Sequence, residues 1–150
     1  MGVVKDFRFP VSVELERGRT TRVTVTDKPR LRVAPPPEFR GAAGLWSPED
    51  LLVASAATCY AVTLAAVAER RLIPIHELAV SGMGHVSQRQ DGRLGFVAIE
   101  LDVRLRTRAE HVEAAERAAR RAEQACLITM ALDVPVHVTA VVEAVEPVPV

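Results

Sequence analysis

The clearest structural signal in this chain lies in residues 47–74, SPEDLLVASAATCYAVTLAAVAERRLIP. Ser47 can cap a helix, Pro48 suits the first helical position, and two acidic residues then place negative charge at the positive end of the helix dipole. The helix should close at the arginine pair 70–71, because cations suit its C-terminal end and Pro74 prevents it from continuing. These residues predict one long helix.

The middle of this helix, residues 51–68, contains no charge. By length alone it touches the lower bound for a membrane span. Most of its side chains are small or weakly polar, however, and such residues contribute little transfer energy. Small side chains on every side are typical of a helix that protein packs tightly all round. We therefore expect a central core helix and no membrane partner.

The chain has 150 residues, the length of one domain, and we expect residues 1–150 to form a single domain. Its 19 basic and 19 acidic side chains balance, which argues against an electrostatic nucleic-acid partner. Two cysteines are too few for a secreted disulfide scaffold or a thiolate zinc site, and the N-terminus lacks the apolar core of a signal peptide. We expect a cytoplasmic location.

Alternation with a period of two predicts strands on both sides of the helix. The predicted elements, in chain order, are strands at 7–15, 22–26 and 31–33 with a turn at Gly18, the helix, hairpin arms at 78–86 and 95–106 with a turn at Asp91-Gly92, a second helix at 109–131, and a strand at 134–142.

The second hairpin arm has the cleanest pattern, with a predicted buried face and charged residues on the other face. The buried face consists of Val97, Ile99, Leu101, Val103 and Leu105. A sheet with one buried face and one solvent-exposed face is typically antiparallel. The second helix carries a narrow apolar stripe from Val112 to Met130 that includes Cys126. The order of elements predicts an α+β fold, an antiparallel sheet packed on two long helices.

Only the two thiols remain as candidates for chemistry. No histidines show metal-ligand spacing, no glycine-rich phosphate loop opens a helix, and no serine lies in a nucleophile elbow, so we expect no metal. Cys59 lies in the middle of the first helix and Cys126 on the second, so the sulfurs can approach if the helices pack together. A buried free cysteine otherwise acts as a small hydrophobe, and a catalytic one needs a nearby cation to lower its thiol pKa.

Two segments of the first helix, SPEDLL at 47–52 and AATCYAVTL at 56–64, resemble the central-helix signature of the OsmC/Ohr family, the osmotically inducible and organic hydroperoxide resistance proteins. In that family a Pro-Glu pair starts a buried helix and a cysteine follows about three turns later. The segment AEQAC, residues 122–126, resembles the second cysteine segment, and the RGR turn at 17–19 resembles the family's Gly-Arg turn. One departure is Leu127, where the family often has proline.

The resemblance implies an OsmC-like domain in an intertwined homodimer, and a thiol-dependent peroxidase that acts on organic hydroperoxides or hydrogen peroxide. Cys59 would attack the peroxide and Cys126 would resolve the resulting sulfenic acid. No bound cofactor is implied, since an external dithiol or lipoyl-type reductant would complete the cycle. An apolar entrance formed by Phe39, Trp46 or Leu127 would suit an alkyl hydroperoxide.

The resemblance further implies that Arg19 holds the thiolate and orients the peroxide, and that Glu49 fixes this arginine. Arg17 and Arg22 remain alternatives to Arg19. Glu49 and Cys59 are ten residues apart, about 15 Å along one helix, so Glu49 can serve Cys59 only through a reaching arginine or from a second subunit.

Two other interpretations keep the same scaffold. One is a non-catalytic redox-sensing or small-ligand-binding protein, which the missing proline after Cys126 favours. The other is a structural dimer with buried cysteines.

Overall fold

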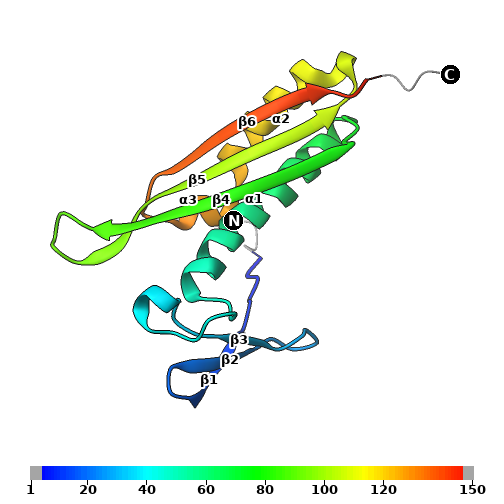
Figure 1. The fold of residues 1–150 in the computed structure, drawn as a ribbon. Coiled ribbons are helices and arrows are strands. Elements are labelled where there is room, and N and C mark those ends of the chain that lie inside the picture. The colour runs from blue at the N-terminus through cyan, green and yellow to red at the C-terminus, as the bar shows by residue number, and fades with distance from the viewer. Residues whose placement is uncertain (1–4, 147–150) are drawn as a thin grey trace. The chain divides into compact units, whose positions relative to one another are not determined.

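The computed structural model describes residues 5–146. Its elements, in chain order, are β1 (Ser12–Arg17), β2 (Thr20–Thr24), β3 (Leu31–Val33), η1 (Pro37–Phe39), α1 (Pro48–Arg70), β4 (Glu77–Gln88), β5 (Leu94–Thr107), η2 (Ala109–His111), α2 (Val112–Ala125), α3 (Leu127–Ala131) and β6 (Val136–Ala144) (Figure 1). The chain divides into two compact units, Met1–Leu51 and Leu52–Val150, and each carries a three-stranded sheet. The fold is α+β as predicted, but it has two sheets where the sequence predicted one.

The sheet of the first unit is antiparallel, with the strand order β1-β2-β3. The turn between β1 and β2 depends on Gly18, whose φ of 57° lies in the left-handed region that glycine populates freely. One face of this sheet carries cross-strand ion pairs. Arg22 Nη2 lies 3.4 Å from Glu14 Oε2 on the facing strand, and Arg32 Nε lies 3.0 Å from Glu16 Oε2.

Strand β1 is exposed along its whole length, whereas the alternation over residues 7–15 is the pattern of a half-buried strand; that interpretation is wrong. Regular pairing begins only at Ser12, and the side chains of Val13 and Leu15 are 60% and 70% exposed. The alternating pattern therefore marks an apolar face that remains exposed.

Helix α1 begins and ends where the sequence predicted. The backbone amide of Asp50 donates to Ser47 Oγ at 3.0 Å, and the amide of Ser47 donates to Asp50 Oδ2 at 2.9 Å, which forms a reciprocal capping box. At the other end Leu72 adopts a φ of 55°, and the amide of Ile73 donates to the carbonyl of Ala68 at 2.9 Å. A left-handed residue after the last turn is a common way to end a helix.

Within residues 5–146, α1 is the only helix long and apolar enough to cross a membrane, judged by length and composition, with a mean hydropathy of 2.0 in its most apolar window. The core helix of a soluble protein can be equally long and apolar. Five side chains of α1 are buried: Ala56, Tyr60, Leu64, Val67 and Ala68. One face of α1 therefore contributes to the core, but 28% of its most apolar window is buried, so the expected packing on every side is not present within residues 5–146.

The sheet of the second unit has the order β4-β5-β6. Strands β4 and β5 form the predicted antiparallel hairpin, with Gly92 at a φ of 81° in the turn. Strand β6, however, is parallel to β5, so the prediction of an antiparallel sheet is wrong here. The reason is the connection: the chain passes from β5 to β6 through α2 and α3, and such a helical crossover returns the chain in the same direction.

Strand β5 has the predicted buried face from Ile99 onward, with Leu101, Val103 and Leu105 also buried. Val97 departs from it and is 36% exposed. The register explains the difference, because Val86 pairs with Phe96 and His85 pairs with Ala98. Val97 is therefore the extra residue of a β-bulge, which reverses the alternation on its N-terminal side.

The predicted second helix is interrupted. Helix α2 ends at Ala125, Cys126 is extended with φ −71° and ψ 111°, and α3 starts at Leu127. The apolar stripe is therefore buried as far as Cys126, whereas Met130 beyond the break is 63% exposed. Two long continuous helices are not present in residues 5–146.

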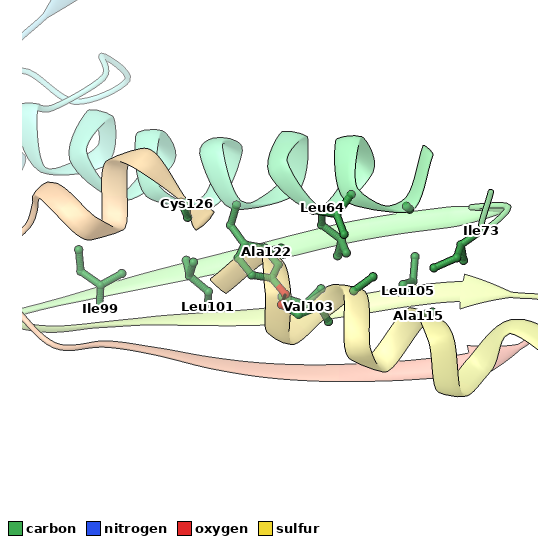
Figure 2. Close-up of a cluster of buried hydrophobic side chains, with 14 residues drawn as sticks. Leu64, Ile73, Ile99, Leu101, Val103, Leu105, Ala115, Ala122 and Cys126 are labelled. Atoms are coloured by element: carbon green, nitrogen blue, oxygen red, sulfur yellow. Dashed lines mark hydrogen bonds between the residues drawn. The ribbon is translucent and has the colours of Figure 1, made fainter. Parts of the chain in front are cut away.

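The core of the second unit lies between one face of its sheet and the helices. It joins Leu64 of α1, Leu101 of β5 and Ala122 of α2, and Cys126 belongs to the same buried cluster. Figure 2 shows these side chains in the layer between the helices and the strands. The segments that carry the two cysteines thus pack against each other, as expected if their apolar faces meet.

Candidate active site at the two cysteines

The structure brings the two cysteines together. Both are reduced; Cys59 is half-buried in α1 and Cys126 is fully buried between α2 and α3. Four groups lower the pKa of the Cys59 thiol: the backbone amides of Ile128 and Leu127, the thiol of Cys126 and the hydroxyl of Thr63.

These neighbours change the acidity of Cys59. Burial raises the pKa of its thiol, because a thiolate loses hydration in the protein interior. The hydrogen bonds outweigh burial, the Ile128 amide most and the Cys126 thiol next, and they hold the pKa of Cys59 below its ordinary value. Because the thiolate is the nucleophilic form of cysteine, this environment favours reaction at Cys59.

The interruption of the helix at Cys126 leaves the backbone amides of Leu127 and Ile128 free to interact with Cys59. The first amides of any helix have no partner inside that helix and point out from its N-terminal end. Since Cys126 is extended, α3 starts afresh at Leu127, and the amides of Leu127 and Ile128 face the Cys59 sulfur. The carbonyl of Cys126 is held in turn by Thr129 Oγ1, which donates to it at 3.3 Å.

The three candidate arginines lie on β1, on β2 and in the turn between them. Arg19 is exposed, and its Nη1 donates to the carbonyl oxygen of Phe39 at 3.2 Å. Arg22 pairs with Glu16, with 3.4 Å between Nε and Oε1, and Arg17 is exposed at the end of β1. Because these arginines and the two cysteines belong to different compact units, the choice of arginine stays a prediction.

Glu49 lies in the first turn of α1 and is half-buried. Its Oε2 atom is buried without a hydrogen-bond partner in the described part of the chain. An unpaired buried carboxylate oxygen is costly, and buried polar groups normally have partners. The side chain is therefore suited to receive a cation, and within residues 5–146 no arginine is paired with it.

The predicted apolar entrance residues are all exposed. The exposed fractions are 38% for Phe39, 49% for Trp46 and 68% for Leu127. Leu127 directly follows Cys126, so one large apolar side chain next to the thiol pair is open to contact from outside.

Two hollows of about 320 and 220 Å³ lie between the α2–α3 segment and β6, and both are lined by Tyr60, Glu123 and Val138. Neither is lined by a cysteine. Burial, together with the charges of Glu123 and Cys126, raises the pKa of Tyr60 to about 12. These hollows are thus separate from the thiol pair.

Sequence reasoning missed Thr63 and the two amides. Thr63 follows Cys59 by four residues, a spacing that places two side chains on the same face of a helix, so this signal was present in the sequence. The amides carried no such signal, because neither glycine nor proline marks the break at Cys126. In residues 5–146 no group of three His, Cys, Asp or Glu side chains could hold a metal ion.

Comparison with protein families gives a match over residues 41–141 to the model described as OsmC-like protein. A comparison with curated proteins gives no match.

Solved structures with the same fold include an OsmC-like protein of unknown function from Vibrio cholerae, which is 12% identical with a TM-score of 0.83 over 91% of this chain and 100% of that one. An organic hydroperoxide resistance protein from Elizabethkingia anophelis is 21% identical with a TM-score of 0.76, over 95% and 99% of the two chains. A third, an organic hydroperoxide resistance protein OsmC from Legionella pneumophila, is also 21% identical, with a TM-score of 0.72 over 91% and 96%. These likenesses establish the fold.

Proposed function

Because this chain belongs to the family of OsmC-like proteins, we propose that it is a thiol-dependent peroxidase that reduces organic hydroperoxides. The observation that carries this proposal is the Cys59 sulfur, which faces a second thiol and has a pKa below its ordinary value. The fold relatives described as organic hydroperoxide resistance proteins support the choice of substrate class.

The first step uses Cys59 as the nucleophile. Its thiolate attacks the hydroxyl oxygen of the hydroperoxide and the O–O bond breaks. The sulfur becomes a sulfenic acid, and the alkoxide that leaves takes a proton to become an alcohol. Hydrogen peroxide would give water in the same way. The exposed side chain of Leu127 beside the thiol pair favours an alkyl group on the substrate.

The second step uses Cys126. Its thiolate attacks the sulfenic sulfur of Cys59, an S–S bond forms, and the oxygen leaves as water. The pairing is supported by the packing of Cys59 against the buried cluster that contains Cys126, and by the effect of the Cys126 thiol on the pKa of Cys59. An external dithiol or lipoyl-type reductant then reduces the disulfide, so the cycle needs no bound cofactor. We place the cycle in the cytoplasm, where such reductants keep thiols reduced.

In this proposal Arg19 stabilises the thiolate and the developing charge on the leaving oxygen, with Arg17 or Arg22 as the alternatives. A guanidinium keeps its charge at any relevant pH and suits both tasks. Glu49 holds the arginine through a carboxylate pair. The support for this role is the buried Oε2 atom of Glu49 that lacks a partner.

We further propose that the enzyme is a homodimer. Five large apolar side chains near the start of the chain are more than half exposed: Phe7, Phe9, Val11, Val13 and Leu15. In addition, only 28% of the most apolar window of α1 is buried. Apolar surface of this extent is typical of a protein–protein interface, and a second subunit would also allow Glu49 to serve a distant Cys59.

Peroxide consumption tests the proposal. Reduced protein is mixed with cumene hydroperoxide and a dithiol, and peroxide loss is followed for the wild type and for Cys59→Ser. We expect turnover in the wild type only. Equal slow rates in both proteins would refute the enzyme, and a single round of disulfide formation without turnover would indicate a redox sensor.

The Cys126→Ser variant tests the resolving role separately. We expect the first peroxide molecule to be reduced at the normal rate, after which Cys59 overoxidises in excess peroxide because no thiol condenses with its sulfenic acid. Mass spectrometry of the Cys59 peptide measures this. Absence of added oxygen on Cys59 would count against the resolving role of Cys126.

A further inference from the structure

The face of β6 that is turned toward the core is only partly covered. Helix α2 packs against this strand (Figure 1). The buried side chains of α2 are all alanines: Ala115, Ala118, Ala119 and Ala122. An alanine side chain is a single methyl group and fills little of the space above the strand. Val138 and Val142 pack against the core but stay half-buried, so apolar surface is left beside the helix.

The two hollows between the α2–α3 segment and β6 lie in this space and adjoin each other. Tyr60, Glu123 and Val138 line both hollows, whose volumes are about 320 and 220 Å³, and we call the two together the α2–β6 groove. Its apolar side follows β6 from Val136 to Val142, a length of about 20 Å. Hollows of this size are typical of sites for small ligands, and the length of the groove suits an elongated one.

The helical side of the groove is charged. Glu116, Arg120 and Glu123 are exposed and lie four and three residues apart, so they share one face of α2. Among the ion pairs of residues 5–146 none involves these three side chains. Two carboxylates and one guanidinium give the groove a net negative charge. Burial and the charge of Glu123 raise the pKa of Tyr60 to about 12, so this carboxylate also acts on the inner end of the groove.

We propose that the α2–β6 groove binds an amphiphilic cation, a molecule with one positively charged head and a linear apolar chain. The head lies at the carboxylates of Glu116 and Glu123, and the chain lies along the valines of β6. Charge complementarity sets the sign of the head, because an anionic head would meet two carboxylates and one guanidinium. The chain removes the half-buried valine surface from water. Neither hollow is lined by a cysteine, so this site does not rest on the proposed peroxidase.

Isothermal titration calorimetry of the reduced protein with decylammonium chloride tests the proposal. We expect saturable binding of one decylammonium ion per chain. Two other ligands separate the contributions of head and chain: decanoate has a chain of the same length with a negative head, and methylammonium has the positive head without the chain. Each should bind at least about tenfold more weakly than decylammonium.

Variants assign the binding to this groove. Glu123→Gln removes one carboxylate that lines both hollows and should weaken decylammonium binding by about tenfold. Ala140→Leu fills the larger hollow from an exposed position of β6 and should weaken binding at least as much. Glu113→Gln is the matched control, because it makes the same change in charge on α2 outside the groove and should bind like the wild type.

Circular dichroism checks that each variant folds, and Glu116→Gln replaces Glu123→Gln if the latter does not. Decanoate that binds as tightly as decylammonium would overturn the inference, because the negative charge of the groove would then have no effect. Equal affinities in Glu123→Gln and Glu113→Gln, or heat that does not saturate with added ligand, would also overturn it.

Discussion

At Tyr60 a single hydroxyl group connects the central helix to α2. The ring is fully buried, and its Oη donates to the carbonyl of Ala119 at 3.1 Å. Burial and the charge of Glu123 raise the pKa of the phenol to about 12. The neutral phenol is therefore part of the packed state, and its ionisation opposes folding.

Tyr60 gives a pH prediction with a defined sign. Below about pH 10 the phenol is neutral in both the folded and the unfolded chain, so its contribution to stability is fully present. Between about pH 10 and 12 only the unfolded chain ionises, and the free energy of unfolding should fall by about 2–3 kcal/mol. Because Tyr60 is the only tyrosine, phenolate absorbance reports it directly.

Tyr60→Phe isolates this effect. The variant loses one buried hydrogen bond and should lose about 1 kcal/mol near neutral pH, but it should lack the fall in stability that the phenol causes above about pH 10. Urea denaturation across this pH range measures both effects. A phenolate that titrates in the folded protein with an ordinary midpoint would contradict the prediction.

At the scale of elements, the start of α3 is where this chain departs from the pattern it resembles. Leu127 occupies the first helical position, and Cys126 before it is extended, which is the conformation that a residue preceding proline prefers. Proline would therefore fit at 127. The leucine supplies what proline lacks, an N–H that faces the Cys59 sulfur.

The variant Leu127→Pro should raise the pKa of Cys59, because one of the groups that lower it is removed. Stability should change little, since the local backbone already suits proline. Thiolate absorbance as a function of pH measures the shift. Leu127→Ala is the control that removes the side chain and keeps the N–H, and identical profiles for the two variants would contradict the prediction.

The contact between α1 and β4 depends on two glycines. A Cβ atom on Gly82 would lie 2.8 Å from Val53 Cγ1, and one on Gly84 would lie 2.6 Å from Phe96 Cε1 and 2.7 Å from Val53 Cγ2. Real Cβ atoms do not approach so closely, so these glycines allow the helix to lie directly on the strand.

Gly84→Ala should therefore destabilise the protein by about 1–3 kcal/mol, the usual cost of overpacking. The loss should appear as a lower urea midpoint with an unchanged slope. Ser81→Ala, at an exposed position of the same strand, should be nearly neutral. If Gly84→Ala were as stable as Ser81→Ala, the helix would have room to move away from the strand.

At the scale of the whole molecule, the sequence predicted features that depend on neighbours along the chain. The capping box of Ser47 and Asp50 and the alternation from Ile99 to Leu105 are local, and both are confirmed. The parallel direction of β6 was missed because alternation looks the same in either direction. The bulge at Val97 was missed because it is defined by the pairing partner.

The candidate site likewise has features that could be predicted from the sequence and features that could not. The approach of Cys59 and Cys126 could be predicted because each lies on an apolar helix face, and apolar faces pack together. Thr63 was overlooked because in a helix rich in small residues a threonine resembles the other space-filling side chains. The pairing of Glu49 with Arg19, Arg17 or Arg22 comes from the resemblance alone and stays a prediction, since it depends on tertiary or quaternary contacts that leave no local pattern.

The uncovered apolar face of β1 leads to the last prediction, which concerns assembly. Val13 and Leu15 alternate with Glu14 and Glu16, whose carboxylates pair with arginines, so the apolar and charged side chains lie on opposite faces. A sheet with one charged and one exposed apolar face needs a partner for the apolar side. We expect this face to be buried between the two copies of a homodimer.

Leu15→Glu should therefore shift the protein from dimer to monomer, because a carboxylate placed in an apolar interface loses hydration without gaining a partner. Sedimentation equilibrium over a range of protein concentrations measures the change, and we expect the dimer dissociation constant to rise by at least about tenfold. Val141→Glu is the matched control: Val141 is 51% exposed on β6, where the same charge should leave the dimer intact. If Leu15→Glu remains as dimeric as the wild type while Val141→Glu dissociates, the subunits meet through the second sheet instead.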